Sequence, residues 1–368
     1  MSKRTPFYNF HVEAGAKFTE FGGWGMPVSY SGILEEAMAV RTSCGLFDLC
    51  HMGEFILTGE DSGKFLNRVT TRDVTKLAPG EIVYSLLCTE EGGIIDDILI
   101  YRFDDKGSPT YMVVANAANT SKDLEWLMAQ EHRSEAIEIQ DKSQEIGLLA
   151  IQGPKSPEIL AQLTEEELSS LTYYTFRMMK VGGVDALVSR TGYTGEDGFE
   201  IYFNPSEGLQ LWDKLLSAGS IIPVGLGARD VLRLEMGYTL YGNDINEDTD
   251  PLEARISWTI AWEKDEFIGK EALLRKKEKG VSRRLTAFVM DERGVPRHGS
   301  PIFYEGSEIG RVTSGTYSPY MKKEIGMGYL PIELTSPETR IEVDIRGKVR
   351  KAHVVKTPFV PSRVKKSK

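Results

Sequence analysis

Short runs rich in apolar and β-branched residues, separated by turn residues, predict that much of the chain forms strands. The clearest runs lie at 45–57, 81–88, 94–101, 111–116, 146–151, 285–290, 302–304 and 341–349. Apolar residues at helical spacing predict short helices at 33–40, 61–69, 124–127, 228–236 and 267–274. Two further short helices are expected after Gly153-Pro154, as far as Leu171. Residues 120–123 match a capping box, which predicts the start of the third of these helices. Beyond residue 283 only strand and turn patterns remain, so we expect an antiparallel β-barrel over 283–361.

The predicted strand at 94–101 carries two adjacent carboxylates, Asp96 and Asp97, after a Gly92-Gly93 turn. Successive side chains of a strand alternate between its faces, so each carboxylate lies among apolar neighbours on its own face. A buried charge without a partner is costly, and the pair therefore implies a partner or a ligand. An alternative stays open from the spacing alone, in which both aspartates bond turn amides and water.

A second polar motif, between residues 189 and 202, separates two strand-like pieces with three glycines, two threonines and an acidic pair. One interpretation is a loop that places Tyr193 and Glu196 in a cavity. The other is a long polar hairpin with solvated charges. The glycine spacing is not that of a phosphate-binding loop, because no Gly-Lys-Ser/Thr or GxGxxG follows a strand here.

The predicted helix at 228–236 carries two arginines, Arg229 and Arg233, spaced so that both lie on one face. They can form a salt-bridged surface with Asp230 and Glu235. They can also form a clamp for a carboxylate ligand, because a guanidinium makes paired hydrogen bonds to such groups. Both interpretations remain open at this point.

Cys50 and His51 occupy the polar centre of the run at 45–57. A cysteine beside a histidine can act as a nucleophile when a third group orients the histidine. No second motif supplies that orienting acid, so we expect His51 to be structural and Cys50 to be unreactive.

Composition narrows the class of protein. Lys and Arg number 44 against 54 Asp and Glu in 368 residues, and the net charge of −10 argues against bulk binding of nucleic acid. The three cysteines form no CxxC pair and no metal-ligand cluster. We therefore expect the protein to lie in a reducing compartment, the cytoplasm, and to bind no metal. The first residues lack an apolar signal core, and no stretch approaches the length of a membrane span, so no membrane partner is expected.

Six motifs in order resemble the T-protein family of the glycine cleavage system, and the likeness runs from residue 4 to residue 359. They are Phe21-Gly22-Gly23-Trp24, Gly45-Leu46-Phe47-Asp48, His51-Met52-Gly53-Glu54, Gly92-Gly93-Ile94-Ile95-Asp96-Asp97, Arg190-Thr191-Gly192-Tyr193-Thr194-Gly195-Glu196-Asp197-Gly198 and Gly227-Ala228-Arg229-Asp230. The resemblance implies a three-domain α+β protein, with antiparallel-sheet folate-binding lobes and a C-terminal antiparallel β-barrel. The expected boundaries are 1–50 with 141–275 for the first lobe, 51–140 for the second and 283–361 for the barrel. Residues 362–368 are expected to form a mobile basic tail.

The same resemblance implies an aminomethyltransferase that depends on tetrahydrofolate. A lipoylated H-protein presents an aminomethyl group on its dihydrolipoyl arm, and the methylene carbon passes to tetrahydrofolate with release of ammonia. The implied catalytic group is Asp97, beside the attacking folate nitrogen. By similarity, Glu196 holds the pterin, Asn116 bonds the ring and Arg229 lies near the folate, whose tail carries carboxylates. The implied apolar and aromatic walls of the folate site are Met52, Tyr84, Val114, Tyr193, Tyr238 and Trp258.

Two other functions remain open: a folate-dependent demethylase of the same superfamily, and a folate-binding module without enzymatic activity. The chain also departs from the family pattern at three positions. Cys50 replaces a usual serine, Arg72 a common asparagine and Arg255 a common glycine. The basic stretches 275–284 and 346–351 are the expected contacts for the H-protein.

Overall fold

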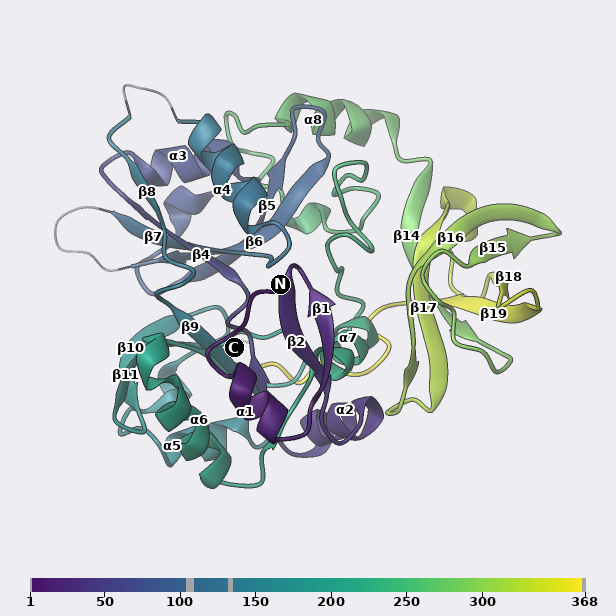
Figure 1. The fold of residues 1–368 in the computed structure, drawn as a ribbon. Coiled ribbons are helices and arrows are strands. Elements are labelled where there is room, and N and C mark those ends of the chain that lie inside the picture. The colour runs from purple at the N-terminus through teal and green to yellow at the C-terminus, as the bar shows by residue number, and fades with distance from the viewer. Residues whose placement is uncertain (1, 104–108, 132–134, 366–368) are drawn as a thin grey trace.

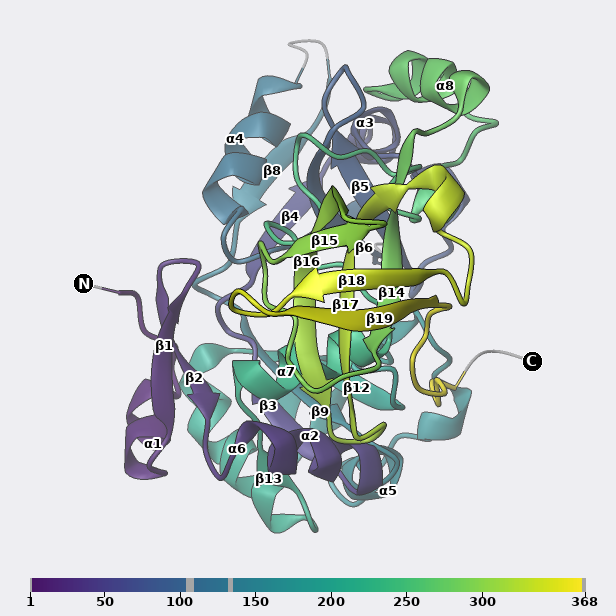
Figure 2. The ribbon, with the colours of Figure 1, turned by 90° about the vertical axis from the view of Figure 1, so that its right-hand side faces the viewer.

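The computed structural model describes residues 2–103, 109–131 and 135–365. The chain forms two lobes, each built on a β-sheet, and a β-barrel that lies beside them (Figure 1). When the molecule is turned by 90°, the barrel lies in front of the lobes (Figure 2). The architecture is α+β, as predicted. Among the described residues, no helix is long and apolar enough to cross a membrane.

The first lobe is built on a six-stranded sheet in the order β10-β11-β12-β9-β3-β13. The only parallel pair in this sheet of described strands is β13 with β3 at one edge. One face packs against α1, α5 and α6, and Trp212 lies at the centre of that core. The other face packs against α2 and α7. The bounds are β3 Gly45–Asp48, β9 Gly147–Gln152, β10 Phe176–Val181, β11 Val184–Ser189, β12 Gly198–Phe203, β13 Ile222–Pro223, α1 Tyr8–Glu13, α2 Ile33–Thr42, α5 Ser156–Ala161, α6 Gly208–Ser217 and α7 Leu226–Glu235.

The second lobe is a five-stranded antiparallel sheet in the order β5-β6-β7-β4-β8. Helices α3 and α4 cover one face, and Phe65 and Leu127 enter that core. The other face packs against the first lobe, where the Tyr101 and Tyr202 hydroxyls hydrogen-bond at 2.8 Å. The predicted 81–88 hairpin with 94–101 is present as β5 and β6. The bounds are β4 Gly53–Thr58, β5 Ile82–Cys88, β6 Ile94–Arg102, β7 Thr110–Ala115, β8 Glu138–Asp141, α3 Ser62–Val69 and α4 Thr120–Ala129.

The segment from residue 245 to 279 packs on the second lobe, whereas the family resemblance placed it, as far as residue 275, in the first. Ile260 and Leu273 share a core with Leu86 and Ile94 of β5 and β6. This segment contains η4 (Ser257–Thr259) and α8 (Lys270–Lys279). Helix α8 therefore extends into the basic stretch 275–284.

The C-terminal region is a closed antiparallel barrel, as predicted, in the order β14-β17-β16-β15-β18-β19. Leu234 of α7 packs with Leu285 and Met327 of the barrel, which fixes the barrel against the first lobe. The bounds are β14 Arg283–Met290, β15 Pro301–Tyr304, β16 Ser307–Ser318, β17 Lys323–Pro331, β18 Arg340–Asp344 and β19 Val349–Val355. The remaining elements are β1 Lys17–Phe21, β2 Trp24–Ser29, η1 Val74–Lys76, η2 Leu168–Ser170, η3 Pro205–Glu207 and η5 Ile332–Leu334.

One local prediction was wrong, and the basic tail makes contacts that the sequence did not predict. The capping box is absent, because α4 begins at Thr120 with no side-chain cap and Asp123 is buried inside the lobe. The described part of the basic tail is bonded to the first lobe through Arg363. The backbone N–H of Arg363 donates to the Gly195 carbonyl at 2.8 Å, and its guanidinium donates to the Arg41 carbonyl at 3.0 Å. Lys366 and Lys368 lie outside the described residues.

Candidate active site

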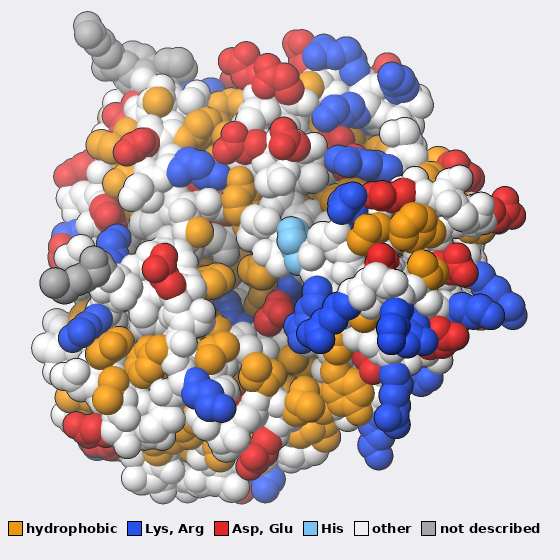
Figure 3. Space-filling model, turned by 45° about the vertical axis from the view of Figure 1, so that its right-hand side comes forward, with side chains coloured by type: hydrophobic (Ala, Val, Ile, Leu, Met, Phe, Trp, Pro, Cys, Tyr) orange, Lys and Arg blue, Asp and Glu red, His pale blue; other side chains and the backbone are white. Residues whose placement is uncertain are grey.

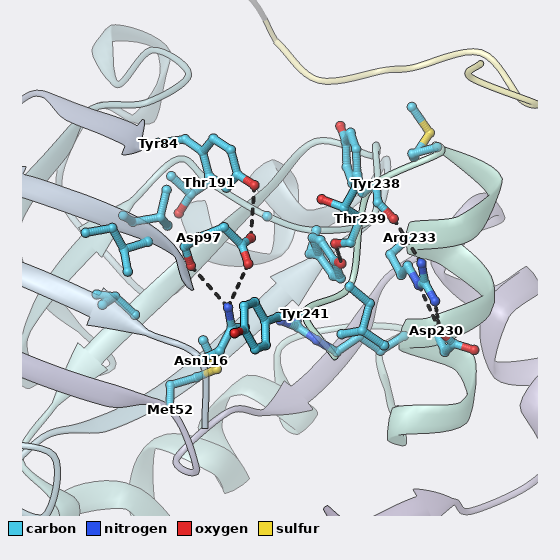
Figure 4. A pocket seen from close by; sticks show the side chains of 18 of the residues that line it. Met52, Tyr84, Asp97, Asn116, Thr191, Asp230, Arg233, Tyr238, Thr239 and Tyr241 are labelled. Atoms are coloured by element: carbon cyan, nitrogen blue, oxygen red, sulfur yellow. Dashed lines mark hydrogen bonds and ion pairs between the residues drawn. The ribbon is translucent and has the colours of Figure 1, made fainter. Parts of the chain in front are cut away.

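A cavity of about 1000 Å³ lies where the two lobes meet the barrel. Strands β5, β6 and β7 supply one wall, and α7 with the following loop supplies the opposite one (Figure 4). Residues 357, 358, 362 and 364, near the C-terminus, also line it. The tail that was expected to be mobile is therefore part of the cavity wall.

Asp97 projects from β6 into this cavity, where its carboxylate has two donors (Figure 4). The Tyr84 hydroxyl donates to Oδ2 at 3.0 Å, and the Asn116 amide donates to Oδ1 at 2.9 Å. Burial, followed by the charge of Asp96, raises the pKa of Asp97 to about 7. At neutral pH the group is therefore poised between its acid and base forms.

Asp96 lies on the opposite face of the strand and is fully buried. It accepts the backbone N–H of Asn116 at 3.1 Å and the side-chain amides of Asn116 and Asn119 at 2.9 and 2.6 Å. Burial, followed by the charge of Asp96, raises the pKa of the neighbouring Asp123 to about 11, so Asp123 is neutral. Among the described residues, the donors to the aspartate pair come from Asn116, Asn119 and Tyr84, and none comes from the Gly92-Gly93 turn. The pair therefore has partners in the protein, as the first interpretation implied.

Two pairs of stacked rings line the cavity. Tyr193 stacks on Tyr238, with ring centroids 5.7 Å apart and planes at 26°. Tyr84 stacks on Trp258, with centroids 5.6 Å apart and planes at 21°. Trp258 is 61% exposed, so this second pair leads from Asp97 to the mouth of the cavity. The structure also brings the predicted residues Met52, Val114, Asn116 and Arg229 into the lining.

The two arginines of α7 have different environments. Arg233 is buried and pairs with Asp230 and Asp244, and its guanidinium also donates to Ser314 of the barrel at 2.7 Å. Arg229 lies over the Tyr193 ring, 4.9 Å from its centroid, and has no ion pair within the described part of the chain. Burial lowers the pKa of Arg229, and the charge of Glu200 opposes that effect. Arg233 is therefore structural, and Arg229 is the guanidinium that can meet a ligand.

The structure does not place Glu196 in the cavity, and that prediction was wrong. Its buried carboxylate pairs with Arg41 at 2.8 Å and with Arg363 at 3.4 Å. The carboxylate that lines this part of the cavity is Glu200, four residues later on β12. Burial raises the pKa of Glu200, and the Thr191 hydroxyl donates to it. A single carboxylate within the otherwise apolar and aromatic run 199–203 was the sequence signal for it.

His51 also lines the cavity, and its Nδ1 has no hydrogen-bond partner within the described part of the chain. Burial lowers the pKa of His51 to about 4, so the ring is neutral. Cys50 points away to Leu148, whose backbone N–H donates to Sγ at 3.2 Å, and burial raises the pKa of the thiol. The pair therefore lacks a thiolate nucleophile. Among the described residues, no group of three His, Cys, Asp or Glu is arranged to hold a metal.

Comparison with known proteins places this geometry in a family. The GCVT N-terminal domain matches residues 7–264, and the glycine cleavage T-protein C-terminal barrel domain matches residues 283–361. An aminomethyltransferase from Halothermothrix orenii is 45% identical over 361 residues, covering 97% of this chain and 100% of the relative. One from Geobacillus sp. is 47% identical over 364 residues, covering 98% of this chain and 99% of the relative.

A solved structure shows the same fold over the full length. The glycine cleavage system aminomethyltransferase T from Bartonella henselae matches with a TM-score of 0.93 and 35% identity, covering 100% of both chains. These matches span the lobes, the cavity between them and the barrel. The chain therefore belongs to the glycine cleavage T-protein family, and these relatives are aminomethyltransferases.

Proposed function

We propose that the enzyme transfers the methylene carbon of an aminomethyl group, carried on the dihydrolipoyl arm of a partner H-protein, to tetrahydrofolate. The carbon leaves its sulfur and its amino nitrogen and becomes bonded to N5 and N10. The products are 5,10-methylenetetrahydrofolate, ammonia and the free dihydrolipoyl thiol. The observation that carries this proposal is Asp97, a carboxyl group of raised pKa held by two donors in the wall of a large cavity.

The residues of the cavity fit a reduced folate. A pterin offers a flat ring with an amino group and ring N–H donors on one edge. The stacked Tyr193 and Tyr238 supply aromatic surface, and Glu200 supplies an acceptor for those donors. Arg229, which has no ion pair among the described residues, and Nδ1 of His51, which has no hydrogen-bond partner among them, supply polar atoms for a ligand. We therefore assign to Glu200 the pterin contact that the family resemblance suggested for Glu196.

Asp97 provides the chemistry that this chain contributes. As a carboxylate it orients the lone pair of the folate nitrogen, stabilises the positive charge that develops there and takes up its proton at Oδ2 or Oδ1. The donors Tyr84 and Asn116 fix the carboxylate in one orientation. The low-polarity surroundings strengthen its interaction with a cationic centre.

We also propose that the enzyme works in a reducing compartment, the cytoplasm, because its three cysteines are free and buried.

We propose that the H-protein binds through the basic stretches 275–284 and 346–351. Figure 3 shows lysine and arginine side chains gathered on the right-hand half of one face of the molecule. Binding through such a surface weakens as the salt concentration rises.

Incubation of the enzyme with aminomethylated H-protein and tetrahydrofolate tests the proposal directly. The expected result is ammonia and methylenetetrahydrofolate in equal amounts. Methyl transfer from a sulfonium or an aryl ether, without ammonia release from the H-protein, would instead identify a folate-dependent demethylase. Folate binding with neither reaction would identify a binding module.

A further inference from the structure

A third buried carboxyl group, Asp123, lies behind the aspartate pair and has no part in the chemistry described so far. It belongs to the first turn of α4, which covers the face of the second sheet opposite the first lobe, and its side chain is fully buried. Neither of its carboxyl oxygens accepts a hydrogen bond from an N–H or O–H donor within the described ranges. A buried carboxylate without donors is costly, so Asp123 must be satisfied in another way.

The lysine next to Asp123 in the sequence is engaged elsewhere. The Lys122 ammonium donates to the Ile95 carbonyl at 2.6 Å and to the Tyr241 hydroxyl at 2.7 Å. Its ion-pair partner is Glu247, at 3.3 Å. Lys122 therefore ties the loop after α7 to β6, and no ion pair joins it to Asp123 among the described residues.

The partner that remains for Asp123 is Asp96. The side-chain amides of Asn116 and Asn119 and the backbone N–H of Asn116 occupy three of the roughly four acceptor positions of the Asp96 carboxylate. Asp96 and Asp123 are in hydrogen-bond contact, and two carboxyl groups can bond only when one of them carries a proton. Three N–H donors favour the charged form of Asp96, so the proton belongs to Asp123. Burial, followed by the charge of Asp96, raises the pKa of Asp123 to about 11, in agreement with this assignment.

We propose that Asp123 is a positioning residue: it keeps its proton and donates it in a hydrogen bond to Asp96, so that Asp96 stays a carboxylate and holds Asn116 in place. The proposal rests on the proposed function, because the group finally positioned is Asp97. Asn116 Nδ2 donates to Asp96 Oδ1 at 2.9 Å and to Asp97 Oδ1 at 2.9 Å (Figure 4). A change at Asp96 therefore reaches Asp97 through one nitrogen atom.

Other ionisable groups face these carboxyl groups from the neighbouring elements. Burial raises the pKa of the four tyrosines among them, so they are neutral near pH 7: Tyr84, Tyr174, Tyr193 and Tyr241. Burial lowers the pKa of Lys122, but the Tyr241 hydroxyl and the Glu247 carboxylate outweigh that effect and raise it, so Lys122 stays charged. Asp97, with a pKa of about 7, is therefore the member of this cluster that titrates near neutral pH.

The pH profile of kcat/KM in variants of Asp123 tests the proposal on the full-length enzyme. Asp123→Leu removes the donor to Asp96, so the buried Asp96 takes up a proton. Burial and the charge of Asp96 both raise the pKa of Asp97, and the second of these causes is then lost. The midpoint should move downward by about one pH unit, and kcat should fall about tenfold because Asn116 is held less firmly. Asp123→Asn keeps a donor of the same shape and should restore both values.

Glu54→Leu is the matched control. Glu54 is another buried carboxyl group of the second lobe, its Oε1 has no hydrogen-bond partner within the described chain, and burial raises its pKa. It lies on β4, outside the cavity lining, and no hydrogen bond joins it to Asp96 among the described residues. The variant loses an acid of the same kind, so the midpoint should stay at the wild-type value.

Infrared spectroscopy locates the proton independently of activity. At pH 9, Asp97 is ionised and Asp123 keeps its proton, because their pKa values are about 7 and about 11. The difference spectrum between the wild type and Asp123→Asn should therefore contain the C=O band of a protonated carboxyl group. This measurement needs only the folded Asp123→Asn enzyme, so it decides the question even when Asp123→Leu fails to fold.

Either of two results would overturn the proposal. One is a difference spectrum without the band of a protonated carboxyl group. The other is a folded Asp123→Leu enzyme whose midpoint lies at or above the wild-type value, or whose lost activity is not recovered in Asp123→Asn. A wild-type enzyme that releases no ammonia from aminomethylated H-protein would instead overturn the proposed function, and the infrared spectrum would still show where the proton lies.

Discussion

The side-chain amide of Asn116 donates to Asp97 Oδ1 at 2.9 Å, and the same nitrogen donates to Asp96 Oδ1 at 2.9 Å. One neutral group thus bridges two adjacent carboxylates on opposite faces of β6. The bridge lowers the repulsion between them and favours the charged form of Asp97, whereas burial favours the neutral form. The balance between these effects sets the pKa of the catalytic group.

The pH profile of kcat/KM tests that balance. Activity needs the Asp97 carboxylate, so it should rise with pH through a midpoint of about 7. Asn116→Ala removes a hydrogen bond to the charged form and should move this midpoint upward by about one unit. A profile whose midpoint is the same in the variant and the wild type would contradict this role of Asn116.

Removing the charge of Glu200 should affect folate binding, whereas removing the charge of Glu196 should affect stability. Glu200→Gln should weaken tetrahydrofolate binding about 10-fold or more, because it removes a charged acceptor from the cavity wall. Glu196→Gln weakens one buried partner of Arg41 but leaves Glu235 paired with it, so the free energy of unfolding should fall by about 1 kcal/mol or more. Calorimetry and denaturant unfolding of both variants measure these effects. The opposite pattern would restore Glu196 as the folate ligand.

The arginines of α7 form a second matched pair. Arg229→Met should raise the KM for tetrahydrofolate about 10-fold with little loss of stability, because Arg229 has no acidic partner within the described chain. Arg233→Met leaves the buried Asp244 unpaired and should destabilise the fold by about 3 kcal/mol. Steady-state kinetics and thermal unfolding separate the two roles, and a stable Arg233→Met enzyme would contradict the structural assignment.

Cys50 should not react in the folded enzyme. Its thiol is buried, and burial raises its pKa, as it does for Cys44 and Cys88. A thiol reagent should therefore modify none of the three until denaturant is added, and Cys50→Ser should change kcat by less than about threefold. Rapid modification of Cys50 with loss of activity would support a nucleophilic cysteine after all.

Local patterns along the chain predicted much of the site. The hairpin of β5 and β6, the alternation that separates Asp96 from Asp97, and the closed barrel all follow from the order of apolar and polar residues. These features depend on residues that are close together in the sequence or on the regular alternation of apolar and polar residues. Both kinds of pattern can be read from one sequence.

The contacts of charged loop residues could not be predicted in the same way. Glu196 and Glu200 are only four residues apart, and their roles differ because Arg41, 155 residues away from Glu196, pairs with it. The position of the C-terminal tail also depends on partners distant in sequence, since Arg363 donates hydrogen bonds to the Gly195 and Arg41 carbonyls. Asp123 resembles a helix cap in sequence but packs beside Asp96. In each case a partner distant in sequence determines where the charge lies.

Asp97→Asn provides the most direct test of the central claim, that this carboxyl group performs the transfer. The amide keeps the shape of the side chain and removes a charge that burial disfavours, so at pH 8, above the pKa of about 7, the fold should be at least as stable as the wild type. Ammonia release from aminomethylated H-protein in the presence of tetrahydrofolate should fall by about 100-fold or more, with folate still bound. Ammonia release at the wild-type rate by a folded Asp97→Asn enzyme would contradict the account.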